Sequence, residues 1–169
     1  GAVTLLLDSG MKIEEVLLNA DASKDSIVFE QLRYALAEAC VVRGTKIDRR
    51  LATSTLIERK GATIEVLHPP DAVVLAGVGV RSKSGAKQSS NSLSAAVRVS
   101  VGENSSILLA GDIEFDCVDG WKNRKVTPQS TALVFPHHGG LPGAASGSDA
   151  ALFAFELVQM VAPSTVIFS

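Results

Sequence analysis

The sequence has few residues of the kinds that build metal knuckles and disulfide frameworks. Its 169 residues include only three histidines and two cysteines. Cys40 and Cys117 lie far apart in the chain, and their spacing fits neither a zinc knuckle nor a disulfide framework. We predict that Cys40 lies on the apolar face of a helix as a small core residue.

The sequence also lacks a strong charge of either sign and a long hydrophobic run. A net charge of −2 gives no overall attraction to nucleic acid or to an anionic membrane, so such binding would need a local patch. No apolar run approaches the roughly 18 residues that cross a bilayer, and no basic leader precedes the first apolar segment. We therefore expect a cytoplasmic protein without a membrane segment.

The composition that remains is typical of a folded globular chain. Hydrophobic residues make up 46% and charged residues 20% of the sequence, and a chain of this length suits one domain over residues 1–169. Apolar runs bounded by turn residues predict strands over 4–10, 14–21, 62–70, 132–136 and 164–169, and a hairpin formed by 93–101 and 105–113. Residues 46–60 show no clear pattern beyond a loop that could hold a short strand.

Two segments carry helical spacing. Val28, Leu32, Leu36 and Ala39 predict a helix with Asp25 or Ser26 as its cap and Gly44 at its end. A second helix is predicted over 148–162, with Ser148 or Asp149 as the cap and Pro163 as the stop. Many strands with helices at wide intervals favour an α+β fold, with a mixed sheet or two sheets flanked by helices.

Two of the predicted strands end in side chains that favour a metal ion. In ILLAGDIEFD, Asp112 follows an apolar run, and in ALVFPHHGG, His137 and His138 follow another. An ionised carboxylate is costly to desolvate without a partner, and imidazole is a common metal ligand. Taken alone, each segment also fits an ordinary turn, with an aspartate that caps backbone amides or a solvated histidine pair.

Together the two segments are more informative than either alone. Neighbouring strands that point the same way bring their terminal side chains together, and Asp8 in LLLDSG is a third carboxylate at a predicted strand end. These residues are still too few, because a catalytic zinc site takes about three protein ligands and a two-metal site takes more.

The ordered set LLLDSG, ATIEVLHPP, NSLSAAVRVSVGENSSILLAGDIE and ALVFPHHGG resembles the metallo-β-lactamase-fold hydrolases. It is most similar to the C-terminal domain of the ComEC-like DNA-uptake competence proteins. The resemblance implies a four-layer αβ/βα sandwich and a site with two divalent ions, zinc or else manganese. It also implies that Asp112 bridges the metals, that His138 is a ligand with His137 as the fallback, and that Asp8 orients ligands from behind. His68 matches a family position that we interpret as structural.

The family's main metal motif, H-x-H-x-D-H, is missing. It should follow the Asp8 turn, where this sequence has only Met11 and Lys12, and no spare histidine replaces it. Either the protein is a degenerate, metal-free member, or a segment after Gly10 is omitted. We favour omission, in which case the mass of the natural protein exceeds 17.6 kDa. The domain over 1–169 would then be partial, and part of a larger protein or complex.

The resemblance implies hydrolysis by metal-activated water, with a phosphodiester of DNA as the substrate. A small-molecule ester or cyclic-nucleotide hydrolase, and a non-catalytic binding subunit, are the alternatives. Two groups of residues are candidates for contact with nucleic acid, by phosphate pairing or by base stacking on the tryptophan: Arg81, Lys83 and Lys87, and then Trp121, Lys122, Arg124 and Lys125. An ordinary solvated loop remains the alternative, since Glu114, Asp116 and Asp119 lie close by in the sequence.

Overall fold

The computed structural model describes residues 2–19, 21, 26–81, 85, 87–140 and 146–168. The chain divides into two compact units, Gly1–Leu51 and Ala52–Ser169. Helices and strands are both present, and a mixed six-stranded sheet dominates the second unit, so the α+β prediction is confirmed. A single metallo-β-lactamase-like domain over 1–169 stays a prediction.

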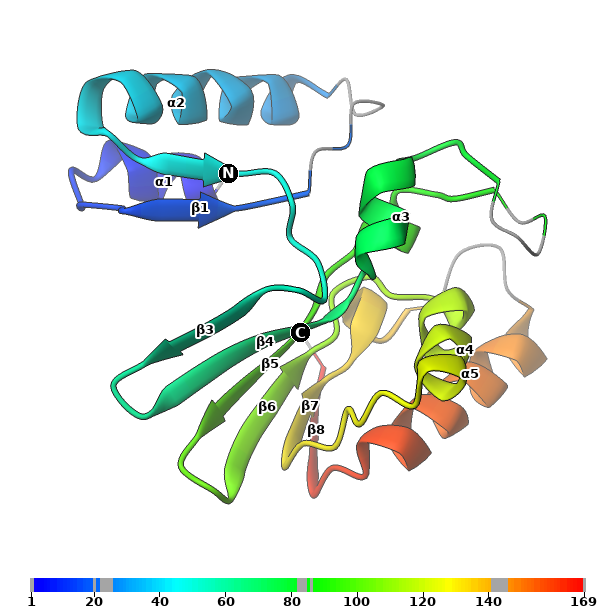
Figure 1. The fold of residues 1–169 in the computed structure, drawn as a ribbon. Helices are drawn as coiled ribbons and strands as arrows, with labels where there is room; N and C mark the ends of the chain where they lie inside the picture. Colours follow the sequence, from blue (N-terminus) through cyan, green and yellow to red (C-terminus); the bar gives the residue numbers. More distant parts are fainter. Residues whose placement is uncertain are drawn as a thin grey trace. The chain divides into compact units, whose positions relative to one another are not determined.

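The first unit pairs two helices with a two-stranded parallel sheet (Figure 1). Its elements are α1 (Ala2–Asp8), β1 (Glu15–Leu17), α2 (Ile27–Arg43) and β2 (Lys46–Asp48). Ser26 caps α2 by accepting a hydrogen bond from the Phe29 N–H, and Gly44 ends it with a left-handed φ of 70°. The predicted helix is therefore confirmed, whereas Asp25 lies outside the described residues.

Two predictions for this unit are wrong. Residues 4–10 form most of helix α1 and the turn after it, not a strand. A short apolar run does not distinguish a strand from a helix, and here Leu7 becomes buried against Leu36 and Ala39 of α2. Cys40 is exposed, because the buried stripe of α2 passes through its neighbour Ala39 instead.

The second unit is built on a six-stranded sheet of order β3-β4-β5-β6-β7-β8 (Figure 1). Its elements are β3 (Leu56–Arg59), β4 (Ala62–His68), α3 (Asp71–Ala76), the 3₁₀ turn η1 (Asn91–Leu93), β5 (Ala96–Val101), β6 (Ser105–Leu109), α4 (Phe115–Arg124), β7 (Ala132–Val134), the turn η2 (Pro136–Gly139), α5 (Gly147–Val161) and β8 (Thr165–Ile167). Strands β3 to β6 pair antiparallel, and β6, β7 and β8 pair parallel. The predicted hairpin is β5–β6.

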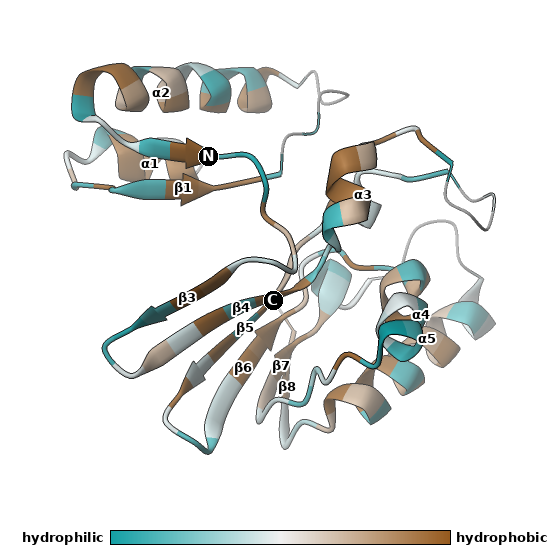
Figure 2. Cartoon of the chain, viewed as in Figure 1, coloured by the Kyte–Doolittle hydropathy of each residue, from teal (hydrophilic) through white to brown (hydrophobic). Residues whose placement is uncertain are grey.

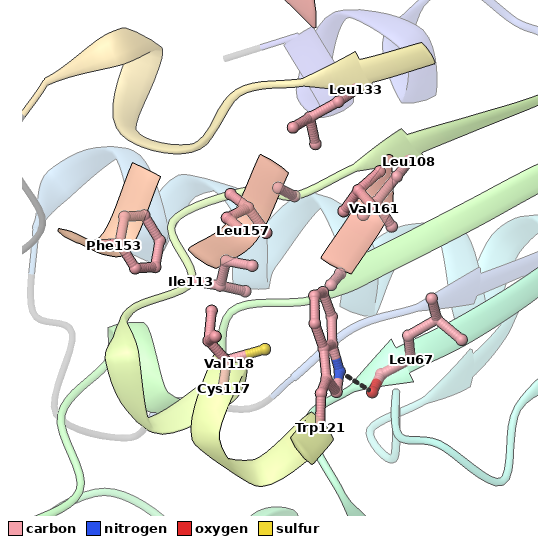
Figure 3. Close-up of a cluster of buried hydrophobic side chains, with 12 residues drawn as sticks. Leu67, Leu108, Ile113, Cys117, Val118, Trp121, Leu133, Phe153, Leu157 and Val161 are labelled. Atoms are coloured by element: carbon pink, nitrogen blue, oxygen red, sulfur yellow. Dashed lines mark hydrogen bonds between the residues drawn. The ribbon is translucent and has the colours of Figure 1, made fainter. Parts of the chain in front are cut away.

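Helices α4 and α5 lie side by side on one face of this sheet (Figure 1). The core between them and the strands is built from twelve buried residues: Leu67, Ala96, Leu108, Ala110, Ile113, Cys117, Val118, Trp121, Leu133, Phe153, Leu157 and Val161 (Figure 3). Trp121 is fully buried and donates its indole N–H to the Leu67 carbonyl at 2.9 Å. Burial also raises the pKa of the Cys117 thiol, so this cysteine is an inert core residue.

The sequence did not predict α4 as a helix. Much of it is hydrophilic (Figure 2), and its buried side chains are those of Cys117, Val118 and Trp121.

The predicted cap residue of α5 is wrong. Ser146 is the cap residue, and its hydroxyl and the Asp149 carboxylate form a reciprocal capping box.

The opposite face of the sheet is apolar but incompletely covered. The strand register places Val66, Val97, Leu109, Val134 and Ile167 in one row across it. Leu109 is 41% and Ile167 is 40% exposed, although the corresponding row on the helix-covered face includes Leu108 and Leu133 at 0%.

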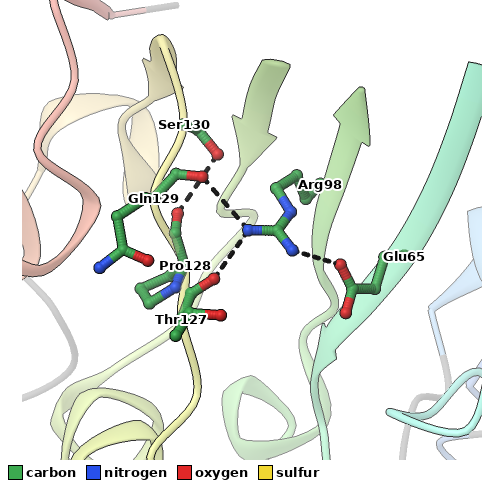
Figure 4. Close-up of polar contacts among 6 residues, drawn as sticks. All are labelled: Glu65, Arg98, Thr127, Pro128, Gln129 and Ser130. Carbon is green, nitrogen blue, oxygen red and sulfur yellow. Dashed lines mark hydrogen bonds and ion pairs between the residues drawn. The ribbon is translucent and has the colours of Figure 1, made fainter. Parts of the chain in front are cut away.

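Arg98 ties the sheet to the loop that follows α4 (Figure 4). It lies opposite Glu65 in the β4–β5 register and pairs with that carboxylate. Its Nη1 donates to the carbonyl oxygens of Thr127 and Gln129, at 2.7 and 3.2 Å. This contact fixes the path of the chain into β7, and hence the position of the turn that β7 leads to.

None of the helices in the described part of the chain has the length and apolar character that a bilayer crossing needs.

Candidate metal centre

The ends of β6 and β7 bring the predicted strand-end residues together. Because the two strands are parallel and Leu109 pairs with Val134, Asp112 and His137 each lie three residues beyond a paired position. The His137 N–H donates to the Gly111 carbonyl at 3.2 Å, which joins the two turns directly. Parallel neighbours thus place both side chains at one edge of the sheet.

The position of Asp112 depends on the tight turn before it. Gly111 has a left-handed φ of 60°, and a Cβ there would lie 2.8 Å from the Ser94 Oγ and 2.9 Å from the Ala95 carbonyl oxygen. The Asp112 N–H donates to the Ser94 Oγ at 2.8 Å. Glycine and serine together hold the backbone of Asp112 against the start of β5, while 57% of its side chain stays exposed.

The position of His137 depends on an unusual turn. In Pro136–Gly139, both His137 and His138 have φ near 50°, and Gly139 has φ 83°. Successive left-handed residues with side chains are costly, and such strain is typical of functional sites. His137 is nearly buried, with 13% of its side chain exposed, and its Nε2 lies 3.1 Å from the Ile113 carbonyl oxygen.

This contact fixes which ring nitrogen of His137 carries the proton. A carbonyl oxygen only accepts, so Nε2 must donate and a neutral ring keeps its lone pair on Nδ1. Nδ1 is the atom nearest to Asp112, at 3.7 Å from Oδ1. Metal-binding histidines usually donate their second N–H to a carbonyl or carboxylate in this way.

The separation of the two side chains suits a shared cation. It is too long for a charge-assisted hydrogen bond, which spans about 2.8 Å. Two ligands at about 2.0–2.2 Å from one tetrahedral ion lie about 3.4 Å apart. This donor pair could therefore fill two positions of a divalent metal site, and with a proton on Nδ1 the same two atoms would form an ion pair.

The chain matches no protein-family model and no curated protein. Membership of the metallo-β-lactamase-fold hydrolases therefore stays a prediction, and the site has to be interpreted from its geometry alone.

The described residues do not complete the ligand set. No group of three or more His, Cys, Asp or Glu side chains suited to a metal occurs among them. The contact with Asp112 is made by His137, which the sequence had ranked behind His138; His138 is exposed on the same turn. Asp8 is the exposed last residue of helix α1 in the first unit, not a strand-end carboxylate.

The residues predicted for nucleic-acid contact around α4 differ in how far they are exposed. Trp121 is fully buried, so its ring has no face free for base stacking. Lys122 pairs with Glu156 at 2.9 Å and Asp119 at 3.6 Å, and the Glu156 hydrogen bond raises its pKa. Arg124 and Lys125 are exposed, whereas Lys83 lies outside the described residues.

Two contributions to this site were missed from the sequence. Ser94 and the Ile113 carbonyl hold Asp112 and His137 in place, but neither carries a recognisable motif. Ser94 lies two residues before the start of β5, and only the folded hairpin brings it to Gly111. Supports of this kind depend on contacts between strands and have no local sequence pattern.

Proposed function

We propose that Asp112 and His137 are two ligands of a divalent metal ion, zinc foremost and manganese second, in a hydrolase that cleaves phosphodiesters of nucleic acid. One observation carries the proposal: Nδ1 of His137 lies 3.7 Å from the Asp112 carboxylate oxygen, while Nε2 lies 3.1 Å from the Ile113 carbonyl oxygen. We assign the metal role to His137 in preference to His138 for this reason.

The architecture that we propose is the four-layer αβ/βα sandwich, of which the second unit would form one half. Within the described residues of this unit, α4 and α5 lie on one face of the sheet, and the other face has an apolar row that includes the exposed Leu109 and Ile167. A sheet with two apolar faces normally has both covered. A second sheet packed on this row is what the sandwich would supply.

The residues of the site have distinct roles in this proposal. A bound divalent ion would supply hydroxide near neutral pH by lowering the pKa of a coordinated water. Asp112 contributes a negative charge on an exposed carboxylate that substrate can approach. His137 contributes an imidazole nitrogen held in one orientation by the Ile113 carbonyl, and Ser94 fixes the backbone that carries Asp112. The described residues supply only these two ligands, so the remaining ligands would have to come from outside them.

Metal titration tests the ligand assignment. We expect Asp112→Asn and His137→Ala each to weaken zinc binding by about 100-fold, because each removes one donor from a small set. His138→Ala is the matched control, since it removes the neighbouring imidazole of the same turn, and it should change the affinity by less than about 5-fold. The measurement is calorimetric titration of zinc and manganese into protein stripped with EDTA, with circular dichroism to verify folding. Unchanged zinc affinity in Asp112→Asn would remove the basis of the proposal.

A second candidate function has its own support. An apolar pocket of about 520 Å³ lies beside the histidine turn, lined by Phe135, Gly139, Gly140, Phe153 and Phe168 among others. Such a pocket suits the apolar group of a small ester better than a sugar–phosphate chain. Exposed Arg124 and Lys125 favour the phosphodiester.

A substrate panel distinguishes the two candidates. We expect the metal-loaded natural protein to cleave single-stranded or duplex DNA and a generic aryl phosphodiester, and Asp112→Ala to lower that rate by at least about 1,000-fold. Faster cleavage of an apolar carboxyl ester than of any phosphodiester would favour the second candidate. DNA cleavage that survives Asp112→Ala would show that the chemistry occurs elsewhere.

A further inference from the structure

A pocket in the Gly1–Leu51 unit shares no residue with the metal site. It encloses about 320 Å³, and its lining comes from one side of α2 and from residues at or just beyond the carboxyl ends of β1 and β2. These two strands are parallel and α2 connects them. Ligands of α/β proteins commonly bind at the carboxyl ends of parallel strands, and the volume is at the lower end of the range for small-molecule sites.

The strand register explains how the strand residues reach this pocket. The Leu18 N–H donates to the Asp48 carbonyl at 2.9 Å, which extends the β1–β2 ladder beyond its last pair. Ile47 packs against the buried Leu36 of α2, so its side chain lies on the helix side of the strands. Side chains alternate along a strand, and Arg49 therefore points to the same side two residues later.

Helix α2 contributes a row of side chains that lie one turn apart. Phe29, Arg33 and Ala37 follow one another at intervals of four residues, and all three line the pocket. The Arg33 Cζ lies 5.5 Å from the centroid of the Phe29 ring, so the guanidinium is held over the ring. Arg33 thus reaches the cavity from the helix and Arg49 reaches it from the strand end.

The charges of the lining favour an anion with a single negative charge. Neither Arg33 nor Arg49 forms an ion pair in the described part of the chain, and both are exposed to solvent. Asp21 also lines the pocket and is 8% exposed. Its carboxylate disfavours a second negative charge on a ligand that two guanidinium groups attract, so a carboxylate suits the site better than a phosphate dianion.

We propose that this pocket binds a small monocarboxylate with an apolar body. The carboxylate accepts from Arg33 and Arg49, because each guanidinium presents paired N–H donors that match two carboxylate oxygens. The apolar body packs on Leu18, Phe29 and Ile47, which are half-buried in the lining. Binding here requires no metal, and it is a property beyond the proposed hydrolase.

Titration calorimetry of the full chain in EDTA tests the ligand class. The ligands are 4-phenylbutyrate, its neutral analogue 4-phenylbutanamide, acetate and phenyl phosphate. We expect phenylbutyrate to bind at least about 10-fold more tightly than the amide, which lacks the charge, and than acetate, which buries little apolar surface. Equal affinities for phenylbutyrate and the amide, tighter binding of phenyl phosphate, or no binding at millimolar concentration would overturn the proposal.

Variants locate the binding within the molecule. Arg33→Gln and Arg49→Gln should each weaken phenylbutyrate binding by at least about 10-fold and leave the amide nearly unaffected. Arg50→Gln is the matched control, because it removes the same charge from the next residue, whose side chain is 77% exposed and pairs with Asp48. It should change the affinity by less than about 2-fold.

Two further measurements complete the test. Circular dichroism verifies that each variant is folded, and Asp112→Asn should bind phenylbutyrate normally, so that failure of the metal site and failure of this pocket are separate results. A preference for the carboxylate that survives both Arg33→Gln and Arg49→Gln would show that the anion lies elsewhere. An equal loss in Arg50→Gln would show that only the general positive charge of the unit attracts it.

Discussion

Replacing Trp121 with alanine is expected to lower the free energy of unfolding by about 4 kcal/mol. The side chain is fully buried among α4, α5 and the sheet (Figure 3), and truncation leaves a large cavity there. The change also leaves the Leu67 carbonyl without its indole donor. Urea denaturation followed by circular dichroism measures the loss.

Two further substitutions make this result interpretable. Trp121→Phe keeps most of the ring and loses the hydrogen bond, so about half of the effect should remain. Lys125→Ala alters an exposed neighbour and should change stability by less than about 1 kcal/mol. A loss below about 1 kcal/mol in Trp121→Ala would contradict the buried position and would restore the sequence-based role in base stacking.

Gly111→Ala is expected to cost about 3 kcal/mol and to displace Asp112. The added Cβ would lie 2.8 Å from the Ser94 Oγ and 2.9 Å from the Ala95 carbonyl oxygen, and the backbone carbonyl cannot rotate away. The left-handed φ of 60° adds its own cost for a residue with a side chain. Chemical denaturation gives the stability, and zinc titration reports on the displaced carboxylate.

Gly102→Ala separates the cost of the steric contact from the cost of the left-handed φ. Gly102 has nearly the same φ, 62°, in the β5–β6 turn, but a Cβ there would have no atom within 4 Å. It should therefore cost only about 1 kcal/mol and leave zinc binding unchanged. Equal losses in the two variants would mean that the close approach of Ser94 and Ala95 to Gly111 is not a constraint.

Elements with a strong local pattern were predictable from the sequence. The α2 helix has apolar residues at helical spacing, a serine cap and a terminal glycine. Strands β4, β5 and β6 are runs rich in apolar residues with turn residues at their ends. Helix α4 was missed because its buried side consists of only Cys117, Val118 and Trp121 within a polar sequence. Residues 4–10 were misassigned because a short apolar run fits a strand as well as a helix.

The candidate site was predictable only in part. The sequence placed Asp112 and a histidine at neighbouring strand ends, because polar side chains directly after apolar runs mark such ends. It ranked His138 before His137, whereas the contact with Asp112 is made by His137 and depends on two left-handed residues and on the Ile113 carbonyl. It also suggested base stacking on Trp121, whose burial follows from the missed helix.

The sequence by itself determined the α+β class, most of the strands and the position of Asp112 and a histidine pair just beyond β6 and β7. These features follow from hydrophobic periodicity and turn residues, which act over a few neighbouring positions. Only the tertiary structure decided that Nδ1 of His137 faces Asp112, that Ser94 supports it and that Arg33 and Arg49 line one pocket. Those relations join residues far apart in the chain, and they exist only once the strands have paired and the helices have packed on them.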